Sequence, residues 1–197
     1  MPHNTANEIR RSFRARMNGI VSQNMRSYGS EYRINWGVSL MHLREMAAEY
    51  APDSNVAQEL WHDDVRESRI MALLLMPADK FNEETARAWM ADLRTQEMAE
   101  MAASLLYAKL NYAPALAVDA MQDENMLIRI LGYNLFARLV TNGFLPEETD
   151  VQKVARNIEN EMHGNNLQAK HAAYSCAIKM EDADILADGV DWHNICQ

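Results

Sequence analysis

Cysteine, proline and glycine are scarce in this sequence of 197 residues, which contains 2, 5 and 7 of them respectively. The two cysteines, Cys176 and Cys196, cannot supply the disulfide framework on which small secreted domains depend. With no signal peptide either, we expect a reduced, cytoplasmic protein. No apolar run approaches the roughly 20 residues that a membrane span requires, so we expect no membrane insertion.

Motifs that would hold a metal or a phosphate cofactor are also missing. The six histidines never adopt a spacing such as His-Glu-x-x-His, and none joins a pair of cysteines. The sequence contains neither a glycine-rich phosphate loop nor a Gly-x-Ser-x-Gly nucleophile motif. We therefore expect no metal and no cofactor, and we interpret the 14 methionines as core filling.

Positive charge is in deficit, because the formal net charge is −9. Taken alone, this value argues against nucleic-acid binding, whose affinity comes mostly from phosphate neutralisation. The charge is uneven, however, since the first 50 residues carry seven arginines and four glutamates. Arg10, Arg11, Arg14 and Arg16 lie in this part, where they form either a phosphate-facing arm or an ordinary solvated helix face.

No segment alternates apolar and polar residues as a half-buried strand would, and helical spacing dominates instead. The stretch 36–75 predicts three amphipathic helices in tandem. Ser39 is expected to cap the first, Pro52 to end it, and Asp63 or Asp64 to cap the third. Asn82, Thr95, either Asn165 or Asn166, and similar residues predict further helix starts along the chain. The sequence therefore indicates an all-α fold of about ten helices.

The helices are expected in antiparallel pairs whose second members resemble one another. These second helices start near 64, 96, 124 and 166, and three share a basic residue followed by a small one: Arg69/Ala72, Arg129/Gly132 and Lys170/Ala173. Such pairs cannot bury their faces alone, and stacking gives them a continuous core. We predict a HEAT-like α-solenoid with a concave face, formed by one domain of residues 1–197 with loose ends at 1–7 and 188–197.

The segments GVSLMHLREMA, AQELW and RESRIMALLL, all within 36–75, resemble the DNA alkylation repair glycosylases, the AlkD-like family. The resemblance covers roughly residues 20–185. It implies HEAT-like repeats curved around duplex DNA and the excision of positively charged alkylated purines without base flipping.

The resemblance also assigns site residues. The family places a tryptophan four residues before an aspartate, and here Gln96 and Glu100 stand at those positions, with Glu97 as a competing assignment. It implies Glu100 as the catalytic carboxylate, stabilising a cationic sugar. In a later repeat the family carries a tryptophan followed by two arginines, and Leu127, Arg129 and Ile130 stand at those positions here. A further tryptophan of the family corresponds to Tyr174. The resemblance and the repeat pattern imply DNA contacts by Arg129, Lys170 and Tyr174.

Each of these residues also has an ordinary structural interpretation. Glu100 fits a surface carboxylate, Arg129 and Lys170 fit ion pairs between repeats, and Tyr174 fits an amphipathic core tyrosine. Because the aromatic lesion contacts are reduced, we expect a DNA-binding protein or a weak alkylpurine N-glycosylase. The alternative is a non-catalytic HEAT-repeat scaffold that binds protein partners on its concave face, which the net charge favours.

Overall fold

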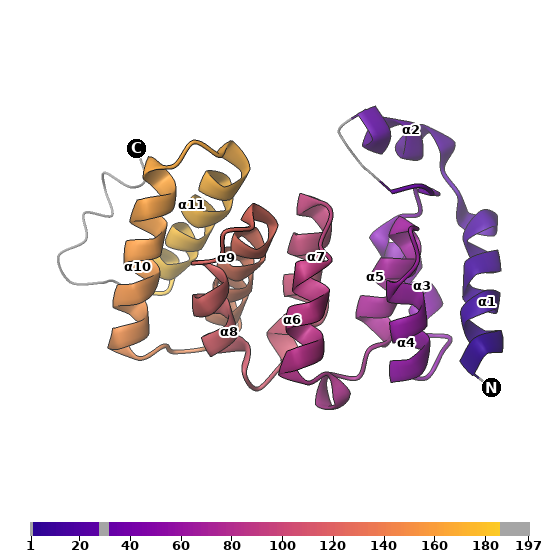
Figure 1. The fold of residues 1–197 in the computed structure, drawn as a ribbon, viewed down its shortest axis with the longest axis horizontal. Coiled ribbons are helices and arrows are strands. Elements are labelled where there is room, and N and C mark those ends of the chain that lie inside the picture. The colour runs from indigo at the N-terminus through magenta and orange to yellow at the C-terminus, as the bar shows by residue number, and fades with distance from the viewer. Residues whose placement is uncertain (1, 28–31, 186–197) are drawn as a thin grey trace. The chain divides into compact units, whose positions relative to one another are not determined.

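The structure, a computed structural model, describes residues 2–27 and 32–185 (Figure 1). These residues are helical apart from loops and one isolated parallel bridge between Ile34 and Val65. The prediction of an all-α fold is thus confirmed. The chain divides into two compact units, residues 1–82 and 83–197, which are described separately below. None of the described helices is long and apolar enough to cross a membrane.

The described part of unit 1 contains five α-helices and two short 3₁₀ helices. They are α1 (Pro2–Ser12), η1 (Phe13–Arg16), α2 (Gly19–Ser27), α3 (Leu40–Ala47), α4 (Ser54–Trp61), α5 (Arg66–Leu75) and η2 (Ala78–Lys80). The chain start differs from the expectation of a loose end up to residue 7, since α1 already begins at Pro2. The reason is apolar spacing: Ala6, Ile9 and Phe13 are buried, and α1 packs against α4.

The three helices predicted for 36–75 are α3, α4 and α5. Ser39 caps α3 as expected, accepting a hydrogen bond from the backbone N of His42 at 3.3 Å. The expected cap of α5 by Asp63 or Asp64 is wrong, because Val65 is its N-cap residue. Both aspartates bond elsewhere: Asp63 accepts from Arg10, and Asp64 accepts from the backbone N of Arg33.

A buried carboxylate organises unit 1. The Glu67 side chain is 0% exposed and accepts hydrogen bonds from the backbone N atoms of Trp36 at 3.0 Å and Val38 at 3.2 Å. Arg66, 2% exposed, donates at 3.1 Å both to Glu67 and to the carbonyl oxygen of Val38. Buried charges persist only when they are paired and hydrogen-bonded. The Arg-Glu pair at the start of α5 therefore fixes the segment that leads into α3.

Gly37 allows α2 to approach that same segment. Its φ is +70°, and a Cβ built there would lie 2.3 Å from the carbonyl oxygen of Asn18 and 2.7 Å from the backbone N of Ser22. Any other side chain would push the start of α2 away. The glycine of the family-like segment 36–75 is thus explained by a close backbone approach and a left-handed φ.

Unit 2 holds the remaining helices: α6 (Glu83–Ala91), α7 (Gln96–Leu105), η3 (Tyr107–Lys109), α8 (Ala113–Ala120), α9 (Met126–Thr141), α10 (Glu148–His163) and α11 (Leu167–Asp182). Helices α7, α9 and α11 form what we call the odd layer, in which α9 packs against both α7 and α11. Helices α8 and α10 belong to what we call the even layer. They contact each other, and α8 packs on α9 whereas α10 packs on α11. Figure 1 shows these helices following one another in chain order.

The small residue of the repeat pattern is the contact point between the two layers. A Cβ built on Gly132 of α9 would lie 2.9 Å from the carbonyl oxygen of Ala117, the Cβ of Ala120 and the backbone N of Met121. The equivalent residues Ala72 and Ala173 are completely buried. Side chains this small let neighbouring helices approach closely, as the repeat pattern predicted.

Replacing Glu67 by alanine leaves buried N–H groups of Trp36 and Val38 without their acceptor and the Arg66 charge without this carboxylate. We expect the free energy of unfolding, measured by urea denaturation, to fall by about 3–5 kcal/mol. Glu45→Ala, on the exposed side of α3, is the matched control and should change it by less than about 0.5 kcal/mol. Equal effects of the two variants would contradict the anchoring role.

Gly132→Ala tests the close contact between α8 and α9. Because the added methyl group would meet backbone atoms of α8, we expect a loss of about 1–3 kcal/mol in unfolding free energy. Gly19→Ala is the control, since a Cβ there has no heavy atom within 4 Å. A neutral Gly132→Ala would show that α8 can move away from α9 freely.

Candidate functional site

Glu100, the predicted catalytic carboxylate, lies on the exposed side of α7. Thr95 caps this helix as expected, accepting from the backbone N of Met98. Gln96, one turn before Glu100, donates from Nε2 to its Oε1 at 2.8 Å. Glu97, the competing assignment, is half-buried, whereas Glu100 is exposed to solvent. Glu100 is thus oriented by an amide at the position where the family carries an aromatic ring.

Arg129, a predicted DNA contact, is engaged within unit 2. Its Nε and Nη2 donate to the Glu161 carboxylate of α10 at 2.6 and 3.3 Å, and its Nη1 donates to the carbonyl oxygens of Asp123 and Glu124. The hydrogen bond with Glu161 raises the pKa of Arg129 above its ordinary value. This geometry matches the other interpretation, a contact between repeats.

The repeat-equivalent residue in unit 1 makes the same backbone contact. Arg69 donates from Nε to the carbonyl oxygen of Asp63, six residues earlier, as Arg129 does to Asp123. Arg69 also lies 4.8 Å from the Trp61 ring centroid. At two of its three positions, the recurring basic residue therefore fastens the second helix of a pair to the loop that precedes it.

Lys170 and Tyr174 lie on α11, whose start is capped by Asn166, one of the two residues predicted for it. Both side chains are half-buried, and Lys170 makes no ion pair with another described residue. Among the described residues, no hydrogen bond or ion pair joins Glu100 to Arg129, Lys170 or Tyr174. The DNA-contact roles of the last two stay predictions.

The two sides of α9 differ in what they expose. Arg129, Gly132 and Tyr133 face the even layer, and half a turn away Asn134, Arg138 and Thr141 reach solvent. Arg138 is exposed and makes no ion pair within the described chain. Arg129 thus points away from the solvent-facing side of its own helix.

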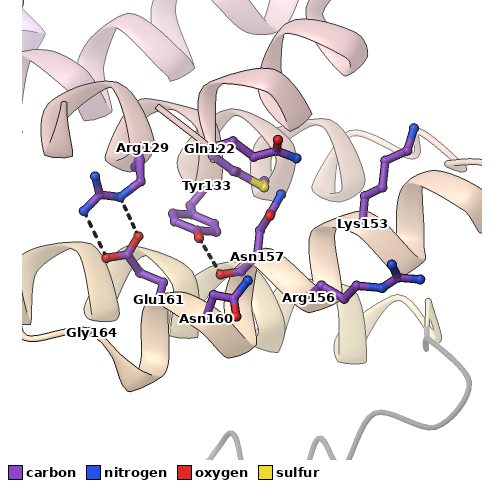
Figure 2. Close-up of a pocket in the computed structure, with 10 residues that line it drawn as sticks. Gln122, Arg129, Tyr133, Lys153, Arg156, Asn157, Asn160, Glu161 and Gly164 are labelled. Atoms are coloured by element: carbon purple, nitrogen blue, oxygen red, sulfur yellow. Dashed lines mark hydrogen bonds and ion pairs between the residues drawn. The ribbon is translucent and has the colours of Figure 1, made fainter. Parts of the chain in front are cut away.

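A polar pocket of about 630 Å³ opens on the even-layer side of α9, at the end of α8 and along α10 (Figure 2). Six of its ten lining residues are on or just after α10; the full lining is Met121, Gln122, Arg129, Tyr133, Lys153, Arg156, Asn157, Asn160, Glu161 and Gly164. The buried Tyr133 hydroxyl donates to the carbonyl oxygen of Asn157 at 2.9 Å. Burial raises the pKa of Tyr133, so the phenol stays a neutral donor.

Charge in this pocket is partly balanced. Glu161 is held by Arg129, and Lys153 donates to Asp150 at 3.0 Å in an exposed pair. Arg156 is exposed and has no ion-pair partner among the described residues. The pocket therefore offers one uncompensated guanidinium beside three side-chain amides.

Sequence reasoning did not single out this pocket, although it predicted α10. Its α10 residues recur at positions 153, 156, 157, 160, 161 and 164, which share one helix face. That spacing was available in the sequence. The partners from α8 and α9 could be located only once the helices were packed.

The other candidate groups of the sequence differ in their surroundings. Arg10 of the proposed basic arm donates to Asp63 at 2.8 Å and to Glu59 at 2.7 Å. Arg11 and Arg14 remain exposed, with Arg14 over the Trp36 ring at 5.6 Å.

The Cys176 thiol is a buried core group, and its burial raises its pKa to about 12. Cys196 lies outside the described residues. Residues 2–27 and 32–185 contain no cluster of three metal-ligating side chains.

The fold and its recurring inter-repeat contacts define a HEAT-like helical repeat protein. Residues 9–177 match the family model described as DNA alkylation repair enzyme, and the chain belongs to this family. No curated protein sequence matches it.

A solved structure shares the fold. It is described as "A new family of proteins related to the HEAT-like repeat DNA glycosylases with affinity for branched DNA structures". The TM-score is 0.81 at 14% identity, over 91% of this chain and 77% of that one. At this identity the likeness establishes the HEAT-like fold alone, which confirms the predicted fold class.

Arg129→Ala separates the two roles considered for this residue. If Arg129 fastens α9 to α10, its loss leaves the nearly buried Glu161 uncompensated, and the unfolding free energy should fall by about 1.5–3 kcal/mol. Arg138→Ala on the exposed side of the same helix should change stability by less than about 0.5 kcal/mol. Wild-type stability of Arg129→Ala together with weakened DNA binding would instead assign Arg129 to a phosphate contact.

Proposed function

We propose that this protein binds DNA and that its N-glycosylase activity is weak or lost. The observation that carries the proposal is membership of the DNA alkylation repair family over residues 9–177. The fold likeness to a protein described as having affinity for branched DNA supports it. In this proposal, branched as well as linear DNA is a ligand.

The surroundings of Glu100 support weak catalysis. A carboxylate that stabilises a cationic sugar acts most strongly in a site from which water is excluded. Glu100 is exposed and hydrogen-bonded to Gln96. Gln96 also offers no aromatic face for a cation–π contact with a positively charged base. Lesion recognition and charge stabilisation are therefore both reduced.

If base release occurs, one carboxylate is sufficient for it. An alkylated purine that already carries positive charge leaves as a neutral base, so it requires no general acid. In this mechanism Glu100 stabilises the oxocarbenium ion as the glycosidic bond breaks and orients the attacking water. Lys170 and Tyr174, with Arg138, are our proposed contacts to the DNA backbone and bases, and Arg129 acts by holding α9 in position.

A non-catalytic scaffold for protein partners is the second candidate. The net charge of −9 favours it, since an acidic surface repels DNA. Affinity capture with and without nuclease separates the two proposals. Partners that survive nuclease treatment, with no direct DNA binding by the purified chain, would favour the scaffold.

Glu100→Gln tests the catalytic part of the proposal. The substrate is duplex DNA containing a cationic N-alkylated purine, and both base release and binding are measured. We expect slow release by the wild type, a further loss of at least tenfold in Glu100→Gln, and unchanged DNA affinity, because the substitution removes charge but preserves shape. Glu97→Gln is the matched control on the same helix turn and should release base like the wild type.

The outcomes distinguish binding from catalysis. Binding without release in any variant would mean that the fold kept DNA recognition and lost the chemistry. Release that survives in Glu100→Gln would refute Glu100 as the carboxylate. An absence of binding at low salt, where phosphate attraction is strongest, would contradict DNA binding itself.

A further inference from the structure

We infer that the α8–α10 pocket is a second DNA contact, which takes the sugar-phosphate backbone of a second arm of branched DNA. This inference rests on the proposed function, and it adds a site that is separate from the solvent-facing side of the odd layer. Figure 2 shows the side chains that line this pocket.

The charges that line the pocket favour an anionic ligand. Of its charged side chains, Arg129, Lys153 and Arg156 are cationic, and Glu161 is the one carboxylate in the lining. Glu161 is neutralised by Arg129 through two hydrogen bonds. Asp150, which lies beside the pocket, is paired with Lys153. Arg156 thus retains its full charge for a phosphate, and Lys153 can exchange an exposed pair worth little for another anion.

The amides in the lining favour a ligand rich in hydrogen-bond acceptors. The Asn157 Nδ2 atom is buried and has no hydrogen-bond partner within the described chain. An unsatisfied buried donor costs about 1–3 kcal/mol, which a bound acceptor would recover once the Asn157 side chain turns toward the pocket. Gln122 and Asn160 add exposed amides beside it. Phosphate and sugar oxygens supply the acceptors that these donors require, as in most protein–DNA contacts.

The location of the pocket separates it from the solvent-facing side of α9. It lies on the side of α9 formed by Arg129 and Tyr133, about half a turn from the half-buried Asn134 and the exposed Arg138 and Thr141. A DNA arm held at α10 and an arm on the odd layer would therefore contact opposite sides of α9. Linear duplex contacts one side at a time, but a junction presents arms to both.

Two of the four acidic residues of α10 lie off this face, and the other two, Asp150 and Glu161, are paired with Lys153 and Arg129. Glu148 and Glu159 are exposed on the other flank of the helix, whereas Lys153, Arg156 and Asn160 line the pocket. A helix with this separation of charge can approach a phosphate backbone on one side although the whole chain is acidic.

The double variant Lys153→Ala/Arg156→Ala tests the inference in the full-length chain. Both residues are exposed, so the fold should persist, as thermal unfolding checks. Affinities for a three-way junction and for a linear duplex of matched length are measured across a salt series. We expect the junction's salt slope to decrease by about 2 in magnitude, one per lost phosphate contact. We also expect the junction's advantage over duplex to disappear while duplex affinity stays unchanged.

Lys80→Ala/Lys109→Ala is the matched control, because it removes the same charge from exposed positions outside the pocket. It should leave the ratio of junction to duplex affinity at the wild-type value. Asn157→Leu is a third, uncharged test, which removes the buried donor and should weaken junction binding alone.

Three results would overturn the inference. The first is an unchanged junction affinity in the Lys153/Arg156 variant. The second is a loss of affinity in that variant that is equal for junction and duplex. The third is a loss of junction affinity in the Lys80/Lys109 control that equals the loss in the pocket variant. Failure of the wild type to bind either DNA would refute the proposed function as well. Duplex binding by a wild type that shows no preference for the junction would refute the second contact only.

Discussion

The buried Glu67 carboxylate is the constraint on which the first unit depends. It accepts hydrogen bonds from the backbone N–H groups of Trp36 and Val38, in the segment before α3, and forms an ion pair with Arg66 of its own helix. A charge with no solvent exposure is tolerable only with such partners, so the positions of α3, α5 and the intervening backbone are fixed together. Gly37 then lets the start of α2 close over the same segment. The resemblance of the segment 36–75 to its family is therefore explained by the requirements of folding, and it carries little information about chemistry.

A second constraint recurs along the chain and explains the repeat pattern. The basic residue at the start of a second helix binds the carbonyl six residues earlier, as Arg69 and Arg129 both do. The small residue three positions later lets the neighbouring helix approach, most closely at Gly132. Arg129, which resembled a DNA contact by its spacing, thus joins α9 to α10 and to the preceding loop. A basic residue at a repeated position is weak evidence for a phosphate contact until its partners are known.

Helical periodicity, capping residues and the repeat were enough to predict the all-α HEAT-like fold and most helix positions. The predictions that differed concern long-range partners. Asp63 failed as a helix cap because Arg10, far earlier in the chain, engages it, and the start of α1 became ordered by packing on α4. The pocket could not be predicted for the same reason, since α8, α9 and α10 each supply part of it. Glu100 was assigned by resemblance, and its exposed, amide-bound setting became visible only in the folded chain.

The account as a whole holds that an acidic chain of this repair family still binds DNA through a few well-placed cations. The most direct measurement is the affinity of the unaltered protein for undamaged duplex DNA as a function of salt concentration. The account predicts binding at low salt, with the logarithm of the association constant falling linearly with the logarithm of salt concentration. A slope between about −2 and −4 would correspond to a small number of neutralised phosphates. No binding at about 20 mM salt, or an affinity independent of salt, would contradict it.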